Sequence, residues 1–301
     1  MLLPPQVHLL VRDWLSGNNV VLLSRDGPVL VDSGYSAHAR LTLALLERVL
    51  GGAPLARLVN THGHSDHVGG NAAIKNAHRC PIAFPEAEAD LVERWDTTAL
   101  LYDYADQYAP RFGVDERLRA GTTHVWGDLQ WHMLAAPGHD MGALVFYNPE
   151  HRILVSGDAL WQNGYGFVMP QCMAPEALPA TRATLDMIAA LDVRIVIPGH
   201  GDAFTDVNAA LDRAYHRTEA YAADDTRMAR YALKALLAFT LLARRSMKIS
   251  ELPAYVERIG VYRDINAAVL RMAPEALAQM LVDELRRAAA IRVESGNVLS
   301  A

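Results

Sequence analysis

One stretch of six residues in this chain holds three histidines and one aspartate: His62, His64, Asp66 and His67. Neutral imidazole nitrogens and carboxylate oxygens are ligands that zinc, iron(II) and manganese accept, with bonds of about 2 Å. Without a metal, imidazoles this close together would compete for solvation and would repel one another when protonated. The stretch therefore predicts a metal-binding loop.

The spacing inside this loop favours two neighbouring metal ions over one. His62 and His64 can point to one side, while Asp66 and His67 turn toward a second position, and one ion cannot easily use all four side chains. Three further candidates stand singly, each after a predicted strand: His139, Asp158 and His200. An isolated histidine is usually structural, so these positions become ligand candidates only because the cluster exists.

The elements that must position these side chains alternate between strands and helices. Strands are predicted at residues 7–11, 19–23, 29–31, 58–60, 129–134, 143–147, 152–155 and 194–197. Helices are predicted at residues 38–50, from about residue 69, at 179–191 and almost throughout after 205, and residues 85–120 carry helical charge spacing. This is an α/β pattern. Nearly every candidate ligand follows a predicted strand, where loops carry chemistry on a rigid scaffold.

Composition is that of a folded globular protein, with 51% hydrophobic and 21% charged residues in 301. The net charge of -6 gives no indication of a polyanion partner. Two cysteines, Cys80 and Cys172, make no disulfide framework. The most apolar helical stretch, residues 232–243, is interrupted by Lys234 and falls short of the ~20 residues of a membrane span. We expect a cytoplasmic protein without a membrane partner.

Five motifs in chain order resemble those of the metallo-β-lactamase superfamily. They are Val31-Asp32-Ser33-Gly34, Thr61-His62-Gly63-His64-Ser65-Asp66-His67, Pro137-Gly138-His139, Ser156-Gly157-Asp158 and Pro198-Gly199-His200. The resemblance covers roughly residues 7–205 and implies a four-layer αββα sandwich with the site at one edge of its two sheets. We expect a catalytic domain at residues 1–205 and a mostly helical appendage at residues 206–301.

The resemblance also implies a role for each ligand candidate. It places one metal ion on His62, His64 and His139. It places the second ion on Asp66, His67 and His200, with Asp158 as the bridge between the two ions. Asp32 would hold groups of the ligand loop by hydrogen bonds. Two divalent ions are expected, with zinc first and iron or manganese as alternatives.

Two such cations lower the pKa of a shared water toward about 7, so the resemblance implies hydrolysis by a metal-bridging hydroxide. Asp66 and Asp158 are the predicted catalytic carboxylates. The expected substrate is a small ester, thioester or lactone. Residues 157–166 resemble those of hydroxyacylglutathione hydrolases (glyoxalase II), although the C-terminal glutathione-binding signature of that family is missing. Lactonases carry a tyrosine where this chain has Trp161.

Aromatic residues after Asp158 are the candidates for the substrate pocket: Trp161, Tyr165 and Phe167. Aromatic packing explains these three about as well. The tyrosines at residues 102–108 indicate either a lid over the site or a helix packed on the sandwich, and the sequence favours the packed helix slightly.

The C-terminal region supplies the alternative function. Residues 228–292 indicate helices and residues 290–299 a hairpin, which resembles the winged-helix-type appendage of some hydrolases of the superfamily, including a nuclease branch. Eleven basic and seven acidic residues stand at 228–301, but they are interleaved, which is typical of a solvated face. A nuclease acting on RNA or single-stranded nucleic acid is therefore the alternative. We expect a small-molecule substrate and no nucleic-acid partner, and a homodimer is left open.

Overall fold

The first sheet of the computed structural model, which describes residues 3–301, starts with short strands rich in valine and leucine. β1 (Val7–Leu10), β2 (Asn19–Leu22) and β3 (Val29–Val31) pair antiparallel. β4 (Arg57–Val59), β5 (Ile82–Pro85) and β6 (Glu116–Leu118) continue the sheet in parallel pairs. The strands stand in the order β1-β2-β3-β4-β5-β6.

The second sheet has five strands in the order β11-β10-β9-β8-β7. They are β7 (Thr123–Trp126), β8 (Leu129–Ala135), β9 (Leu144–Asn148), β10 (Ile153–Gly157) and β11 (Ile195–Pro198). β10 and β11 are parallel, and helix α5 (Ala177–Ala190) lies between them in the chain. A parallel pair needs such a crossover.

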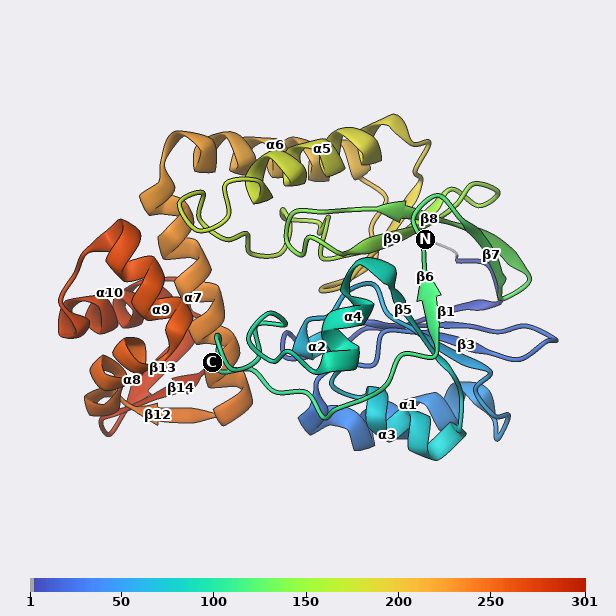
Figure 1. Cartoon of the computed structure of the whole chain (residues 1–301), viewed down its shortest axis with the longest axis horizontal. Helices are drawn as coiled ribbons and strands as arrows, with labels where there is room; N and C mark the ends of the chain where they lie inside the picture. Colours follow the sequence, from blue (N-terminus) through green and yellow to red (C-terminus); the bar gives the residue numbers. More distant parts are fainter. Residues whose placement is uncertain (1–2) are drawn as a thin grey trace.

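Alternation along the strands creates the layers, because successive side chains point to opposite faces of a sheet. Val20 and Leu22 lie in the core between the sheets with Trp131 and Phe146 of the second sheet, whereas Val21 faces the other way. The outer face of the first sheet is covered by α1 (Ala39–Leu50), α3 (Asn71–His78) and α4 (Glu86–Arg94). Helices α5 and α6 (Val207–Ala223) cover the second sheet (Figure 1). The predicted αββα sandwich is confirmed.

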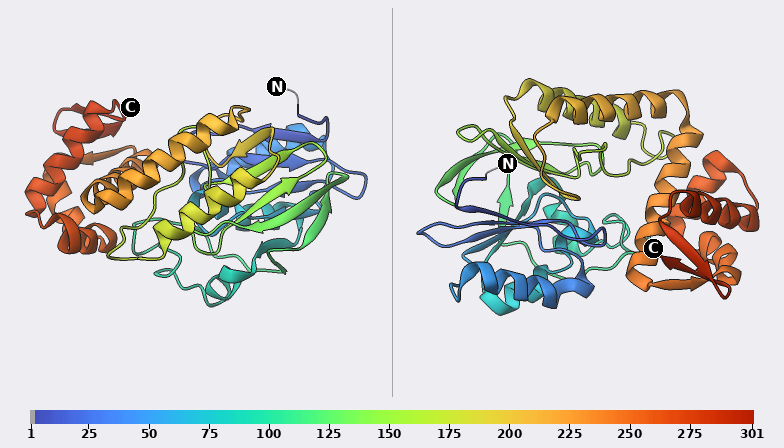
Figure 2. Two further views of the ribbon diagram at one scale, coloured as in Figure 1. Left: turned by 90° about the horizontal axis from the view of Figure 1, so that it is seen from above. Right: turned by 180° about the vertical axis from the view of Figure 1, so that it is seen from behind.

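Residues 225–300 add a mostly helical region with a small sheet beside the sandwich (Figure 2). Its elements are α7 (Asp225–Arg244), β12 (Ser246–Lys248), the 3-10 turn η2 (Ile249–Glu251), α8 (Leu252–Arg258), α9 (Gly260–Ile265), the π-turn η3 (Asn266–Leu270), α10 (Pro274–Arg287), β13 (Ile291–Glu294) and β14 (Asn297–Ser300). The hairpin β13–β14 was predicted. β12 was not, and it completes a sheet of order β12-β14-β13.

This region has its own hydrophobic core, which includes Leu233, Leu237 and Leu281. Helix α6 instead packs its apolar residues into the core beneath α5. The division of the chain at residue 205 and the winged-helix character of residues 206–301 stay predictions. The order of helix, strand, helices and hairpin after residue 225 supports the winged-helix prediction.

The prediction of helix over residues 85–120 was wrong beyond α4. Trp95 follows α4 with a φ of 57°. This left-handed conformation cannot continue a right-handed helix. Turns occupy residues 97–106, and the chain then enters β6. Two short helical elements complete the inventory, the 3-10 turn η1 (Ser36–His38) and α2 (Ser65–Val68). In the described part of the chain, no helix combines the length and the apolar character that crossing a membrane requires.

Candidate metal centre

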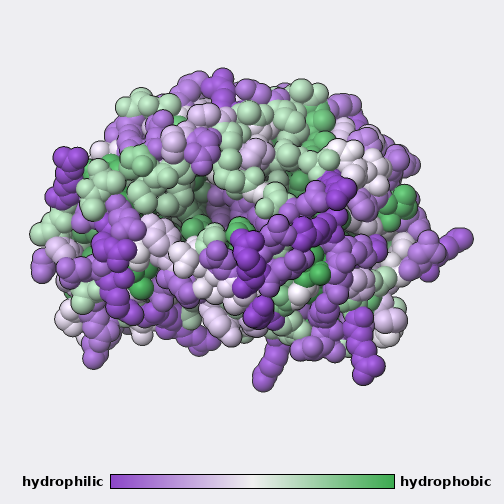
Figure 3. Space-filling view, viewed as in Figure 1, coloured by the Kyte–Doolittle hydropathy of each residue, from purple (hydrophilic) through white to green (hydrophobic). Residues whose placement is uncertain are grey.

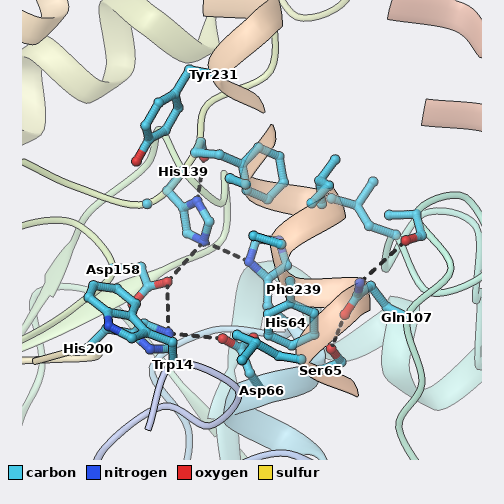
Figure 4. A pocket seen from close by; sticks show the side chains of 18 of the residues that line it. Trp14, His64, Ser65, Asp66, Gln107, His139, Asp158, His200, Tyr231 and Phe239 are labelled. Carbon is cyan, nitrogen blue, oxygen red and sulfur yellow. Dashed lines mark hydrogen bonds and ion pairs between the residues drawn. The ribbon is translucent and has the colours of Figure 1, made fainter. Parts of the chain in front are cut away.

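All seven predicted metal ligands lie together in the structure. Figure 4 shows five of them around the cavity: His64, Asp66, His139, Asp158 and His200. The seven come from four loops that follow β4, β8, β10 and β11: His62, His64, Asp66 and His67 from the first, then His139, Asp158 and His200. In the second sheet β8 and β10 are both antiparallel to β9, and β11 is parallel to β10, so these three strands end at the same edge. Their loops converge there with the loop that follows β4 of the first sheet. The side chains form two groups, and within each group the potential ligand atoms lie within 4.8 Å of one another.

The first group consists of three imidazoles. Nδ1 of His64 lies 2.8 Å from Nε2 of His139. The His62 ring is 4.8 Å from that of His64 and 5.3 Å from that of His139, between centroids. Three nitrogens facing a common point are the donor set of a transition-metal site.

The second group consists of two aspartates and two histidines. Oδ2 of Asp66 lies 3.0 Å from Nε2 of His200, and Nε2 of His67 lies 3.8 Å from the same oxygen. Asp158 connects the two groups, since its Oδ1 lies 3.4 Å from Nε2 of His67 and its Oδ2 lies 3.4 Å from Nε2 of His139. One carboxylate therefore faces both groups.

Asp32 fixes the orientation of the first ligand loop. Its carboxylate accepts hydrogen bonds from the Thr61 amide at 2.9 Å, from the Thr61 hydroxyl at 2.8 Å and from Nδ1 of His67 at 2.8 Å. Since the Thr61 hydroxyl donates to Asp32, it accepts from Nδ1 of His62 at 3.0 Å. Both imidazoles thus carry their proton on Nδ1 and turn Nε2 toward the site.

The surroundings of these two Nε2 atoms show whether the residues present fit a metal ion. Among residues 3–301, the Nε2 atoms of His62 and His67 are buried and have no hydrogen-bond partner in the protein. A buried nitrogen without a partner is costly, and a metal ion is the partner that this donor set suits. His139 is held in the same way, because its Nδ1 lies 2.5 Å from the Phe167 carbonyl oxygen and its Nε2 faces the site. The side chains present fit divalent metal ions.

The electrostatics of His62 and His139 agree with their role as metal ligands. Burial, together with His67 and His64, holds the pKa of His62 well below its usual value. Burial and His64 lower the pKa of His139 to about 4. Both rings are therefore neutral at pH 7, and a metal ligand must be deprotonated in this way. Burial alone would lower the pKa of His67, but Asp158, Asp66 and Asp32 together raise it well above its usual value.

A cavity of about 490 Å³ opens at this centre. That volume falls within the range of about 300–1,000 Å³ typical of small-molecule sites. Trp14 and Trp161 stand on one side of the cavity, where the Trp14 ring stacks on His200 with centroids 5.4 Å apart and meets Trp161 edge to face. Phe167 lines the cavity beside His139. Two of the three predicted pocket aromatics, Trp161 and Phe167, thus face this space.

The prediction that Tyr165 lines the pocket was wrong. Its side chain is 1% exposed, packs in the core beneath α5 and α6, and bonds through its hydroxyl to Thr218. Trp161 and Gly164 form a bridge that folds the loop back, so Tyr165 turns away from the cavity. The tyrosine at 102 does line the cavity, from a turn and not from a helix, and its hydroxyl donates to the Gly63 carbonyl oxygen.

Sequence reasoning missed the cavity residues Trp14 and Phe239, and the role of Thr61 beside His62. Trp14 lies in the loop between β1 and β2, and Phe239 lies on α7, far from every motif. Thr61 was noted as part of its motif without a role. Of these three residues, only Thr61 could have been found from the sequence, because a hydroxyl group directly before His62 can form a hydrogen bond that orients the imidazole ring.

The profile of the metallo-beta-lactamase superfamily matches residues 12–200, which include Asp32 and every ligand candidate. The chain belongs to the metallo-β-lactamase superfamily. The matched residues end at His200, just beyond β11. Helix α6 and the C-terminal region therefore lie outside the residues that the superfamily profile matches.

Among curated relatives in the superfamily, a hydroxyacylglutathione hydrolase of Hyphomonas neptunium is 31% identical over 119 residues. These residues make up 40% of this chain and 39% of that protein. The chain thus matches about two fifths of the length of this relative.

Solved structures agree with the superfamily fold. A metallo-beta-lactamase family protein of Thermus thermophilus superposes with a TM-score of 0.56 and 20% identity, over 99% of both chains. A second protein, solved in a di-iron-bound form, superposes with a TM-score of 0.55 and 26% identity, over 69% of this chain and 98% of its own. The first likeness shows the fold alone, and it extends through the C-terminal region.

Proposed function

We propose that this protein is a dinuclear metal-dependent hydrolase that acts on a carboxylic ester, thioester or lactone. The observation that carries the proposal is the position of Asp158, whose two oxygens face the two ligand groups at 3.4 Å each. The three histidines would hold one ion, and Asp66, His67 and His200 would hold the other, with Asp158 between them. Zinc suits this nitrogen and oxygen set, as does iron, which is bound in the 26%-identical structure.

Two divalent cations in these groups would supply a water ionised at neutral pH and a Lewis acid for a carbonyl oxygen. In such a hydrolysis the hydroxide would form a bond to the carbonyl carbon, and the bond from that carbon to the leaving oxygen or sulfur would break. The proton released when the water ionises would pass to the leaving atom, which gives an acid and an alcohol or thiol. Asp66 and Asp158 are the carboxylates that face this space. We assign the orientation of the attacking water to Asp66 and the bridging position to Asp158.

The surrounding residues keep these groups in place. Thr61 and Asp32 hold the rings of His62 and His67, and the Phe167 carbonyl oxygen holds that of His139. Apolar side chains on the far side of the cavity exclude bulk water from the reacting bond, which strengthens every charge interaction there. No serine or cysteine nucleophile is required.

Two considerations favour carboxyl substrates over nucleic acid. A curated relative is named for hydrolysing a glutathione thioester. In the described part of the chain, no lysine or arginine lines the cavity, whereas phosphodiester backbones are bound by such residues. The nuclease alternative therefore ranks second.

Metal analysis and a substrate panel test the proposal. We expect about two metal ions per chain, turnover of aryl esters, thioesters or lactones, and loss of that turnover on chelation. His62→Ala and Asp158→Ala should lower metal content and abolish turnover, while His216→Ala, an exposed histidine of α6, serves as the matched control. Cleavage of single-stranded RNA at comparable catalytic efficiency, or a purified protein that holds no metal, would overturn the proposal.

A further inference from the structure

Helix α7 carries apolar side chains on two opposite faces. Leu233, Leu237 and Leu241 are fully buried in the core of the C-terminal region. A second set recurs at intervals of three and four residues, as one stripe of a helix does: Tyr231, Ala235, Ala238, Phe239 and Leu242. This second stripe lines the cavity that contains His64, Asp66 and Asp158.

The stripe is long. At a rise of about 1.5 Å per residue, the eleven steps from Tyr231 to Leu242 span about 16 Å of helix. The surface is hollowed between the C-terminal region and the sandwich, with hydrophobic residues around part of the hollow (Figure 3). Leu100, Leu101 and Ala105, in the turns after α4, line the same cavity. Leucine and alanine thus dominate the end of the cavity that lies away from the histidines.

The polar groups of the cavity gather elsewhere. Its charged lining side chains are the ligand candidates, and Ser65 donates to Oε1 of Gln107 at 2.9 Å. Arg217 contacts the Tyr231 ring from outside the cavity, with its guanidinium 4.9 Å from the ring centroid. Its two terminal nitrogens donate to the carbonyl oxygens of Asn163 and Tyr165.

We propose that the α7 stripe binds the aliphatic acyl chain of the substrate, so that the enzyme prefers esters, thioesters or lactones of medium to long fatty acids. The carbonyl lies at the metal centre, the chain runs along α7, and the leaving group faces Trp14, which is 57% exposed. Among residues 3–301, a glutathione moiety would find no cationic side chain in this lining to meet its carboxylates. This inference rests on the proposed function for the position of the carbonyl.

Affinity should rise with chain length as methylenes enter the channel. Each buried CH₂ contributes a factor of about four in affinity. Calorimetry of the metal-loaded protein with hexanoate, octanoate, decanoate and dodecanoate should show the dissociation constant falling about fourfold per added methylene over at least part of the series. A constant value across the series would overturn the inference.

A blocked channel supplies the matched comparison. Ala238→Phe and Ala235→Phe each fill the stripe, and either should reduce the ratio of kcat/KM for dodecanoyl to acetyl p-nitrophenyl ester at least tenfold. Ala243→Phe, on the same helix but outside the cavity lining, is the control. Unchanged chain preference in both folded channel variants would overturn the inference.

These readouts separate the two proposals. If the fatty acids bind with the expected increments but no ester, thioester or lactone is hydrolysed, the proposed function fails and the channel stands. If short and long esters are hydrolysed equally well and the fatty acids bind equally, the channel fails and the proposed function stands.

Discussion

The indole nitrogen of Trp161 donates a hydrogen bond to Oδ1 of Asp158 across 3.1 Å. The same oxygen lies 3.4 Å from Nε2 of His67, so the indole holds the carboxylate that connects the two ligand groups. The proposed bridge thus has a positioning residue three positions further along the chain. Its ring also meets Trp14 and His200 edge to face.

Trp161→Phe tests this contact, because it keeps an aromatic ring and removes the donor. Partners behind a metal ligand typically contribute about 10–100-fold to affinity or activity, and we expect kcat to fall about tenfold with a smaller change in KM. Steady-state kinetics on one ester measures both. Trp14→Phe keeps the stacking on His200 and should change kcat less than threefold. Equal effects of the two substitutions would contradict this role of Trp161.

Asp32→Asn should weaken metal binding, although Asp32 is not one of the proposed metal ligands. The carboxylate accepts three hydrogen bonds, and an amide can accept them at only one of its two heavy atoms. His67 and Thr61 then lose their fixed orientation, and we expect affinity for zinc to drop about 10–100-fold. Competition with a chromophoric chelator measures it. Asp26→Asn, in an exposed turn, should leave the affinity unchanged.

Gly166→Ala should displace a ligand by crowding. A Cβ at this position would lie 2.5 Å from Nδ1 of His139, which is closer than side-chain atoms approach. The ring must move, and its hydrogen bond to the Phe167 carbonyl oxygen is lost. We expect metal affinity at least tenfold lower, read as metal retained per chain after dialysis. Gly113→Ala, where an added Cβ meets nothing within 4 Å, is the control.

Glu284 should make stability depend on pH in the C-terminal region. Burial alone would raise the pKa of Glu284, but hydrogen bonds from Lys234 and Arg230 lower it overall. A lowered folded-state pKa stabilises the fold above the unfolded value of about 4.3, and this contribution is lost as the pH falls through the folded pKa. Glu284→Gln should therefore lower Tm at pH 7 by about 1–4 °C.

The pH dependence separates charge from packing. Below the folded pKa of Glu284, wild type and Glu284→Gln should melt at the same temperature, because the carboxyl is then neutral in both states of the wild-type protein. Thermal melts followed by circular dichroism between about pH 3 and pH 7 measure the difference. Glu257→Gln, an exposed glutamate of α8, should show no such dependence. A Tm difference for Glu284→Gln that persists at low pH would assign the effect to packing.

The convergence of the ligand candidates was predictable because the signals for their positions are local in the sequence. Each ligand candidate stands directly after a strand whose apolar run is visible in the sequence, as at Val59 before His62 or Ile197 before His200. Strand ends meet at one edge in this type of sandwich, so order along the chain was enough to expect that these loops converge. The alternation of elements indicated an α/β pattern, and the two outer layers of helices were implied by the resemblance to the superfamily.

The lining of the cavity was not predictable, because it depends on how distant segments pack. Residues 232–243 indicated a core helix, and Leu233, Leu237 and Leu241 do lie in a core. Nothing in the pattern distinguishes them from Ala235 and Ala238, which face the cavity, because both sets are apolar at helical spacing. The prediction that Tyr165 lines the pocket was wrong for the same reason. Only the fold decides whether an aromatic side chain faces a pocket or a core.

One side of α7 packs into the core of the C-terminal region, and the other side lines the cavity at the ligand candidates. The loops that carry the ligand candidates all belong to the sandwich and contain no residue of α7. In the proposed channel, exchanges of small side chains along that helix would change which molecules are accepted, while the ligand candidates stay the same. Relatives with identical ion-binding loops would then differ in the compounds they consume according to the sequence after α6.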